Sequence, residues 1–161
     1  MEKIIKVGMA DLNVCIAPDA ITTLGLGSCV GIVLYDKIKK IGGLAHIMLP
    51  DSSKIMNNSN KAKFADTGID TLINDMKKIG AKEDNLIAKI AGGAQMFEFS
   101  SNSDMLRIGI RNVEATKFKL KELGIRIVAE DTGKNYGRTI TFYPKTGELH
   151  IKSMGKDIII V

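Results

Sequence analysis

The stretch ITTLGLGSCVGIVLYD, residues 21–36, contains most of what decides the fold. It begins with a β-branched run, passes through a turn that contains Gly25 and Gly27, and ends in a second β-rich run from Val30 to Tyr35. β-Branched residues favour strands, and closely spaced glycines favour tight turns. The stretch therefore predicts a strand, a tight loop and a second strand.

The second of these strands is predicted to pair with the segment that follows it. The polar tetrapeptide KIKK, residues 37–40, is typical of a solvated turn between the apolar segments Val30–Asp36 and Ile41–Leu49. A four-residue turn pairs Asp36 with Ile41 and makes the numbers of all paired residues sum to the same value. We therefore expect an antiparallel hairpin with a defined register.

This register brings a cysteine and a histidine together. With Asp36 opposite Ile41, Cys29 and His46 lie on the same face of the hairpin, diagonal to each other at roughly 5–8 Å between backbones. Gly31 pairs with His46 and leaves room for the imidazole ring. A turn of odd length would place the two side chains on opposite faces, so the prediction depends on the register.

The residues before the cysteine favour a reactive role. Gly25 and Gly27 allow a tight turn that exposes backbone N–H groups around the sulfur, and an oxyanion hole needs such groups. An imidazolium of His46 that lowered the thiol pKa by about two units would make thiolate the main form of Cys29. Spacing alone leaves open that Cys29 is a small buried hydrophobe and His46 a satisfied core residue.

The rest of the chain predicts an α+β domain with two helices. Apolar residues at steps of three and four predict a helix over 65–79, followed by Gly80. Asn112 is predicted to cap a second helix that ends before Gly124. The polar segment Asp51–Lys63 is predicted to be a mobile loop. Further strands are expected at Ile4–Ala17, Leu86–Ala91, Ile125–Val128, Arg138–Tyr143, Glu148–Lys152 and Asp157–Val161.

Composition narrows the class of protein. The 161 residues, with 45% hydrophobic and 25% charged residues, fit one globular domain, residues 1–161. No CxxC or HxxxH spacing occurs, so we expect no metal site and no other cofactor. No apolar stretch reaches the length of a membrane span, and no secretory leader is expected, so we predict a soluble, cytoplasmic protein without membrane insertion. The net charge is only +5, the basic residues are scattered among acidic ones, and the chain has only eight aromatic residues. We therefore expect no nucleic-acid partner.

Two glycine-containing segments and the second cysteine and histidine are interpreted as structural. GLGSC is followed by neither GK[ST] nor a helix, so it does not predict a phosphate loop. AGGAQMF, residues 91–97, lacks the third glycine of a dinucleotide fingerprint and predicts tight backbone packing. Cys15 and His150 have no glycine-rich turn or matched partner beside them, so we expect both to be structural.

The motifs together resemble a known family. TLGLGSCVGIVLYD and the histidine of GGLAHIMLPDS are similar to segments of the CheD family, the chemoreceptor glutamine deamidases of bacterial and archaeal chemotaxis. The similarity continues in the same order through KFADTGIDTLINDMKKIGA, KIAGGAQMF, IGIRNVEA and AEDTGKNYGRTITFYPKTGEL. It therefore extends over nearly the whole chain.

The resemblance implies a site, a fold and a reaction. Its catalytic set is Cys29, His46 and Thr23, the threonine that opens TLGLGSC. Its fold is an α/β sandwich of two packed mixed sheets with helices on the outside. The implied reaction is attack of Cys29 on the carboxamide of a receptor glutamine, with His46 as acid and base and Thr23 holding the imidazole.

The resemblance also implies partners, and other functions stay open. The substrates would be the cytoplasmic helices of chemoreceptors, and the CheC phosphatase would be a regulatory partner. The segment Gln95–Phe99, with Phe97 and Phe99, is a candidate partner surface, whereas core packing of both rings is the alternative. A non-catalytic binding module for receptors or CheC, and a cysteine peptidase or amidase that uses the same dyad, remain as alternative functions.

Overall fold

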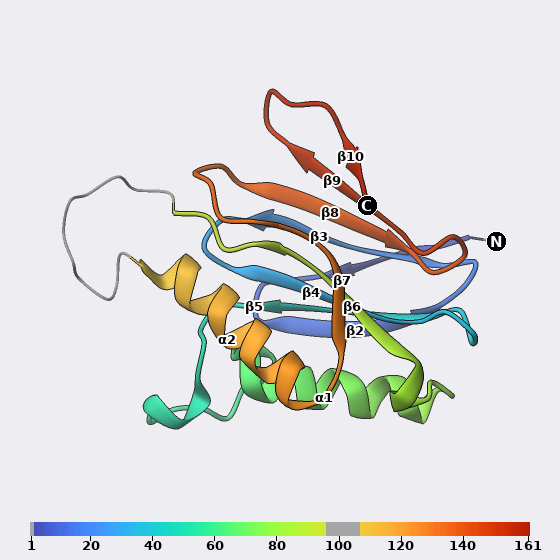
Figure 1. Cartoon of the computed structure of the whole chain (residues 1–161), viewed down its shortest axis with the longest axis horizontal. Helices are drawn as coiled ribbons and strands as arrows, with labels where there is room; N and C mark the ends of the chain where they lie inside the picture. The colour runs from blue at the N-terminus through green and yellow to red at the C-terminus, as the bar shows by residue number, and fades with distance from the viewer. Residues whose placement is uncertain (1, 96–106) are drawn as a thin grey trace.

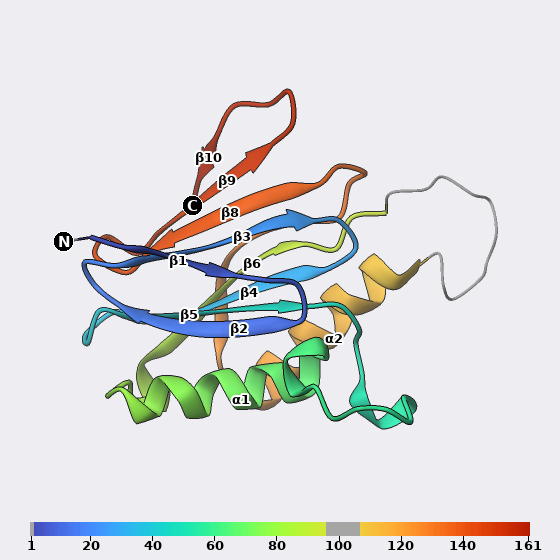
Figure 2. The ribbon, with the colours of Figure 1, turned by 180° about the vertical axis from the view of Figure 1, so that it is seen from behind.

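A computed structural model describes residues 2–95 and 107–161 of the chain, and its strands form two sheets (Figures 1 and 2). Sheet A has the strand order β1 (Ile4–Val7), β3 (Ala20–Leu26), β8 (Arg138–Tyr143), β9 (Glu148–Ser153) and β10 (Ile159–Ile160). Sheet B has the order β2 (Asp11–Ile16), β5 (Ile41–Ile47), β4 (Val30–Asp36), β6 (Leu86–Gly92) and β7 (Arg126–Thr132). The pairs β1–β3 and β6–β7 are parallel and the others are antiparallel, so both sheets are mixed.

The molecule has three layers. Helices α1 (Ala65–Lys78) and α2 (Ile108–Glu122) cover one face of sheet B, and sheet A packs against its other face (Figures 1 and 2). This confirms the predicted sandwich of two mixed sheets with helices on the outside. Both helices lie on the same side of the sandwich, against sheet B. Short 3-10 helices, η1 (Ser52–Lys54) and η2 (Lys61–Lys63), lie within the polar segment before α1, and η3 (Glu83–Asn85) precedes β6.

Sheet B is buried on both faces, which explains its sequence. Val30 and Ile32 of β4 pack in the core beneath the helices, whereas Val33 and Tyr35 pack in the core between the sheets. All seven residues of β4 are buried. A central strand covered on both sides has no solvent-facing positions, so its sequence is a continuous apolar run without alternation.

The hairpin has the predicted register. Asp36 pairs with Ile41, and Gly31 pairs with His46. The carboxylate of the buried Asp36 accepts hydrogen bonds from the backbone N–H groups of Ile38 and Lys39, both at 3.0 Å. The acidic residue that ends β4 therefore stabilises the turn that fixes the register.

The prediction that Asn112 caps the second helix is wrong. The helix begins at Ile108, so Asn112 lies in its second turn, where it is fully buried. Asparagine is favoured at N-caps because its side chain competes with helical hydrogen bonds. Here that side chain instead donates to the backbone of two other segments. The predicted helix end is confirmed, since Gly124 follows α2 with a φ of 72°.

Candidate active site

His46 is held between the two sheets by a chain of hydrogen bonds. Its side chain on β5 is 1% exposed, and Nδ1 lies 2.7 Å from Oγ1 of Thr23 on β3. The Thr23 hydroxyl donates its single hydrogen to the carbonyl of Val7 at 2.7 Å. Oγ1 then accepts from Nδ1, which assigns the ring hydrogen to Nδ1 and leaves a lone pair on Nε2 of the neutral imidazole.

Cys29 lies in the turn of residues 27–29 that joins β3 to β4, called the cysteine turn below. The residue is 7% exposed and belongs to the core between the two sheets, with Val33 and Tyr35 of the same strand face. His46 reaches into the same layer, because its ring contacts Thr23 of sheet A. The predicted placement of Cys29 and His46 on one face is therefore confirmed.

Two backbone amides of the following segment hold the cysteine turn. Gly93 N–H donates to the carbonyl of Cys29 at 2.8 Å, and Ala94 N–H donates to the carbonyl of Gly27 at 2.9 Å. A side chain at Gly92 would collide with the carbonyl oxygen of Cys29. The prediction that AGGAQMF is a tight backbone packing site is thus confirmed for its described residues.

The strand before the turn is irregular. The pairing of β3 with β8 shifts between Thr23 and Leu26. Leu24 is 61% exposed within this bulge, and Gly25 has a φ of 67°. A positive φ at this position favours glycine, so the predicted conformational role of Gly25 is confirmed.

Burial disfavours charge on both members of the dyad. It raises the pKa of the Cys29 thiol above the ordinary 9.0, although the backbone N–H of Cys29 partly offsets the effect. It also lowers the pKa of His46 below the ordinary 6.5. Thiol and imidazole are therefore both neutral at pH 7. Burial thus opposes the formation of a thiolate next to an imidazolium in this resting state.

Gly31 also has a role in packing. A Cβ on Gly31 would meet side-chain atoms of Ile140 and Leu26, at 2.7 Å and 3.0 Å. The glycine therefore makes room for close packing between the sheets, and room for the imidazole of His46 stays a prediction. This close packing matters for the site because β3 of sheet A carries Thr23.

Two buried side-chain polar atoms have no hydrogen-bond partner within residues 2–95 and 107–161. They are Nε2 of His46 and Oδ1 of Asn112. Buried polar groups are almost always paired, so an unpaired one needs an explanation. Asn112 belongs to the surroundings of the site, because its amide nitrogen donates to the carbonyl of Ser28, next to Cys29. Sequence patterns did not indicate Asn112 as part of the site.

The second cysteine and histidine lie apart from this site. Cys15 is buried on β2, opposite Gly42 of β5, and burial together with the charge of Asp19 raises its pKa to about 12. His150 lies on β9, where the centroid of its ring is 4.7 Å from that of Tyr143, with the two ring planes tilted by 57°. The hydrogen bonds of the described residues do not join either side chain to the cysteine turn, and the structural roles expected for Cys15 and His150 stay a prediction.

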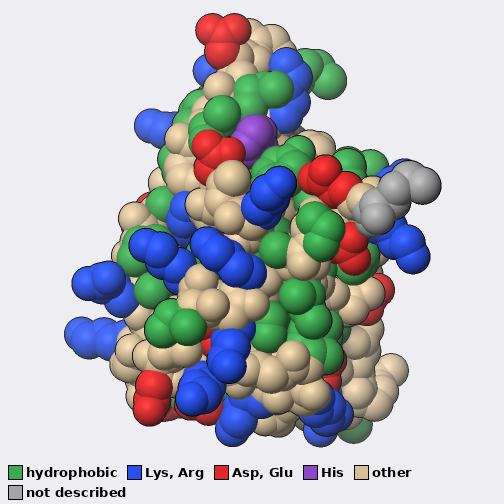
Figure 3. Space-filling view, turned by 90° about the vertical axis from the view of Figure 1, so that its right-hand side faces the viewer, with side chains coloured by type: hydrophobic (Ala, Val, Ile, Leu, Met, Phe, Trp, Pro, Cys, Tyr) green, Lys and Arg blue, Asp and Glu red, His purple; other side chains and the backbone are tan. Residues whose placement is uncertain are grey.

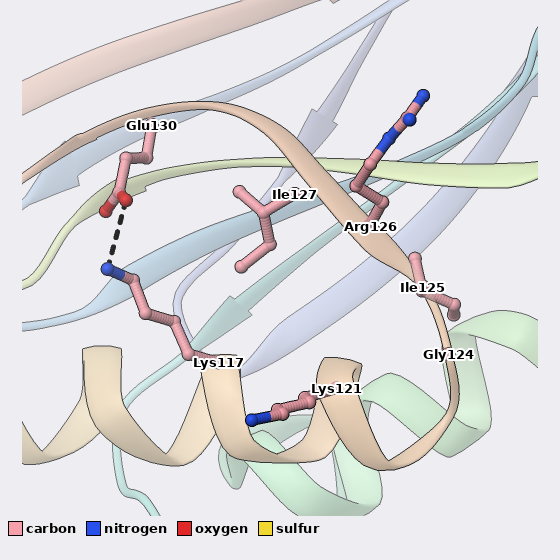
Figure 4. A pocket seen from close by; sticks show the side chains of 7 residues that line it. All are labelled: Lys117, Lys121, Gly124, Ile125, Arg126, Ile127 and Glu130. Atoms are coloured by element: carbon pink, nitrogen blue, oxygen red, sulfur yellow. Dashed lines mark ion pairs between the residues drawn. The ribbon is translucent and has the colours of Figure 1, made fainter.

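Charged side chains are spread over the surface. On the side shown in Figure 3, Lys and Arg side chains are distributed over the face, with Asp and Glu side chains at several points among them. A hollow between α2 and β7 is lined by Lys117, Lys121, Arg126 and Glu130, of which Lys117 and Glu130 form an ion pair at 3.0 Å (Figure 4). It contains no predicted site residue.

A second hollow opens at the β3 bulge, close in sequence to the cysteine turn. It has a volume of about 600 Å³, and its lining includes Gly25, Tyr136, Lys152 and Met154. Glycine, an aromatic ring and a flexible apolar side chain offer contact area for a polypeptide, and the lysine adds a positive charge. Because Gly25 lies on β3, this hollow borders the strand that carries Thr23.

The remaining predictions concern metals, membranes and partners. The described part of the chain has no group of three or more His, Cys, Asp or Glu side chains that could hold a metal ion. Among the described residues, no helix has the length and apolar character needed to cross a membrane. The candidate partner residues Phe97 and Phe99 lie outside the described residues.

The arrangement as a whole is typical of hydrolases with a cysteine nucleophile. It combines a thiol in a glycine-containing turn, an imidazole on the same face and a hydroxyl that fixes the tautomer of that imidazole. A family model described as CheD chemotactic sensory transduction matches residues 48–153. The matched span begins after His46, so this match does not itself include the three predicted site residues.

Curated relatives extend the similarity over the rest of the chain. The "Probable chemoreceptor glutamine deamidase CheD" of Lachnoclostridium phytofermentans is 68% identical, over 97% of each chain. That of Caldanaerobacter subterraneus is 62% identical, over 97% of this chain and 96% of the relative. The "Chemoreceptor glutamine deamidase CheD" of Halalkalibacterium halodurans is 58% identical, over 96% of each chain. The chain belongs to the CheD family.

Proposed function

We propose that this protein is a chemoreceptor glutamine deamidase, a protein-glutamine glutaminase that converts receptor glutamine side chains to glutamate and releases ammonia. The names of its relatives give the substrate class. The hydrogen bond that Nδ1 of His46 donates to Oγ1 of Thr23 carries the mechanistic part of the proposal, because it directs the lone pair of Nε2 away from Thr23. Cys29, His46 and Thr23 are the proposed catalytic residues, within one domain of residues 1–161.

The first half of the reaction forms a thioester. The Cys29 sulfur attacks the carboxamide carbon while its proton passes to Nε2 of His46. The carbonyl oxygen becomes an oxyanion, which N–H groups of the cysteine turn stabilise. The carbon–nitrogen bond then breaks, and the proton held by His46 leaves with the nitrogen as ammonia. A neutral thiol and a neutral imidazole suit this order of steps, since Nε2 of His46 is unprotonated and can accept the thiol proton.

The second half hydrolyses the thioester. His46 removes a proton from water as the water oxygen attacks the same carbon. The carbon–sulfur bond breaks, the sulfur regains a proton from His46, and a glutamate side chain is released. Overall, one glutamine and one water give one glutamate and one ammonia. Each modified site on the receptor gains a negative charge at neutral pH.

Mass spectrometry of a receptor cytoplasmic fragment tests the substrate, the reaction and the site together. After incubation with the protein, selected glutamines should show the mass increase from amide to carboxylic acid, and the fragment should stay intact. Cys29→Ala should remove both the mass change and the ammonia. Ammonia release by Cys29→Ala would overturn the assignment of the nucleophile. Cleavage of the fragment would instead support the cysteine peptidase.

The alternative function is a binding module in which Cys29 and His46 only pack. Alkylation with iodoacetamide separates the two functions, and Cys15 provides an internal comparison because burial raises its pKa to about 12. A catalytic Cys29 should react faster than Cys15, and His46→Ala should slow the reaction of Cys29 near neutral pH. Equal and slow reaction of both cysteines, with no effect of His46→Ala, would support the binding module.

On the ground of the family resemblance, we also propose where the protein acts and which protein regulates it. Receptor modification sites on cytoplasmic helices place the protein in the cytoplasm, and CheC is the proposed regulatory partner. Mixing purified CheC with the protein should change its elution volume in size-exclusion chromatography and its rate of ammonia release. If CheC and the protein, mixed at micromolar concentration, each elute at the same volume as when run alone, a stable complex is excluded.

A further inference from the structure

Asn112 connects the helix layer to the cysteine turn. Its side chain is fully buried on α2, and Nδ2 donates to the carbonyls of Ser28 and Met48, both at 2.9 Å. Ser28 precedes Cys29 in the turn, and Met48 follows the strand that carries His46. One amide group thus bonds to the backbone beside both members of the dyad.

The contacts fix the orientation of the amide. Both acceptors are carbonyl oxygens, so the atom that faces them must be the donor Nδ2, and both of its hydrogens are used. Oδ1 of Asn112 is left buried without a partner in the described residues. An unpaired buried acceptor is costly, so the favourable hydrogen bonds of this side chain are the two that Nδ2 donates.

The bond to Ser28 determines where the N–H of Cys29 points. The peptide between these residues is trans, since the described chain has its single cis peptide at Ala17–Pro18. In a trans peptide, the carbonyl and the following N–H point in opposite directions. Holding the Ser28 carbonyl towards α2 therefore directs the N–H of Cys29 away from the helix. The backbone–backbone hydrogen bonds of the described turns and loops do not include this N–H, which instead acts on the sulfur of Cys29 itself and lowers the pKa of that thiol.

The neighbouring peptides are held differently. The carbonyls of Gly27 and Cys29 accept from backbone N–H groups of Ala94 and Gly93. These two donors belong to the main chain, so they do not depend on the side chains at positions 93 and 94. The Ser28 carbonyl depends on the Asn112 side chain instead. A substitution at Asn112 consequently releases one peptide of the cysteine turn and leaves the other two anchored.

We propose that Asn112 is a positioning residue that holds the Ser28–Cys29 peptide so that the N–H of Cys29 faces the oxyanion of the reaction. The inference rests on the proposed function, because it assumes that Cys29 attacks a carboxamide. It assigns to α2 a part in catalysis through the backbone, without contact between Asn112 and the substrate. Removing the anchor should lower kcat and leave KM unchanged, since the oxyanion exists only in the transition state and the intermediates.

The experiment compares two reactions of the same sulfur. Deamidation of a receptor fragment passes through an oxyanion, whereas alkylation by iodoacetamide does not. In Asn112→Ala we expect kcat to fall about 10- to 100-fold, a little less than on loss of an oxyanion-hole donor itself. The rate of Cys29 alkylation at its alkaline plateau should stay within about twofold of the wild type, because this step needs no oxyanion stabilisation. A residue with a merely structural role would change both rates together.

Two further variants complete the design. Thr116→Val is the matched control, because Thr116 is equally buried one turn further along α2 and its hydroxyl donates to the carbonyl of residue 112, within the helix, at 2.8 Å. It should leave kcat and alkylation unchanged. Asn112→Ser retains one donor and should give a smaller loss of kcat than Asn112→Ala. Thermal unfolding of each sample shows that the compared proteins are folded.

Each outcome decides one claim. Unchanged kcat in Asn112→Ala, or a parallel loss of alkylation and kcat, overturns the role of Asn112. Failure of both Asn112→Ala and Asn112→Ser to fold assigns the residue to stability and also overturns it. If the wild type releases no ammonia, or Cys29→Ala is as active as the wild type, the proposed function itself is wrong.

Discussion

Thr23 and His46 lie on different sheets, and the 2.7 Å hydrogen bond between Oγ1 and Nδ1 joins the sheets at the candidate site. The imidazole extends from sheet B, and the hydroxyl that orients it extends from sheet A. Thr23 is in turn fixed by its bond to Val7 on the neighbouring strand. The geometry of the base therefore depends on how the two sheets pack, and not on one strand or one turn.

Thr23→Val should lower activity much more than its effect on stability explains. The variant keeps the side-chain shape but removes the acceptor for Nδ1 of His46, so the imidazole loses its fixed tautomer. We expect kcat for ammonia release to fall roughly 100-fold, less than the roughly 10⁴-fold effect known for a charged orienting group. Unfolding by urea should show a loss of about 2 kcal/mol, from the unpaired carbonyl of Val7 and the ring nitrogen.

Thr22→Val is the control for this prediction. Thr22 lies next to Thr23 on β3 and is also buried, but its hydroxyl donates to the carbonyl of Ile140, at 2.7 Å, within sheet A. Its removal should lower stability to a similar extent and leave kcat within about twofold of the wild type, since the imidazole keeps its partner. Equal kcat in the two variants would remove Thr23 from the mechanism.

The pH dependence of deamidation should follow His46. Burial lowers the pKa of His46 below 6.5. The protonated imidazole cannot accept the thiol proton, so kcat/KM should rise with pH through an apparent pKa below 6.5 and be constant around pH 7 to 8. Ammonia release measured between pH 5 and pH 8 would show this limb. His150→Gln should show the same rise of kcat/KM with pH. A rise centred above pH 7 would contradict the assignment of His46 as a buried neutral base.

Local patterns in the sequence predicted much of the fold and half of the site geometry. The hairpin register follows from a short turn and from strand alternation, so the shared face of Cys29 and His46 could be derived from spacing. Thr23 could not, because its contact with His46 joins two sheets across 23 residues of chain. Only the family resemblance indicated it.

The features that sequence patterns missed have the same physical origin. Asn112 looks like a helix cap, yet its partners lie 84 and 64 residues away, at Ser28 and Met48. The effect of an imidazolium on the Cys29 thiol could be derived from the sequence, but the opposing effect of burial could not. Desolvation depends on how sheet A covers sheet B, and no pattern within one segment of this sequence reports that contact.

Salt should lower kcat/KM for receptor substrates. The net charge of +5 favours approach to acidic cytoplasmic helices, and exposed charges are screened as ionic strength rises. We expect kcat/KM on a receptor fragment to fall roughly 3- to 10-fold between about 20 mM and 500 mM NaCl. Alkylation of Cys29 by uncharged iodoacetamide should not change over this range. A flat dependence of kcat/KM would exclude charge attraction as a part of substrate binding.

Asp36 should make the stability of the hairpin dependent on pH. Its side chain is fully buried, and burial alone would raise its pKa. Hydrogen bonds from the N–H groups of Lys82, Lys39 and Ile38 and from the Asn85 amide outweigh burial and lower the pKa below the ordinary 3.8. The folded state therefore prefers the carboxylate more strongly than the unfolded chain does.

The sign of the pH effect follows from that preference. Because the pKa in the folded state lies below that of the unfolded chain, the stabilisation is complete above about pH 4 and is lost as the pH falls through the folded pKa. Asp36→Asn should therefore lower the free energy of unfolding at pH 7, by about 2–3 kcal/mol, since an amide cannot accept all four bonds. The difference from the wild type should shrink below pH 4. Urea unfolding from pH 7 to pH 2, with the exposed Asp84→Asn as control, would measure it. A difference that stays constant with pH would show that the carboxylate charge of Asp36 does not stabilise the turn.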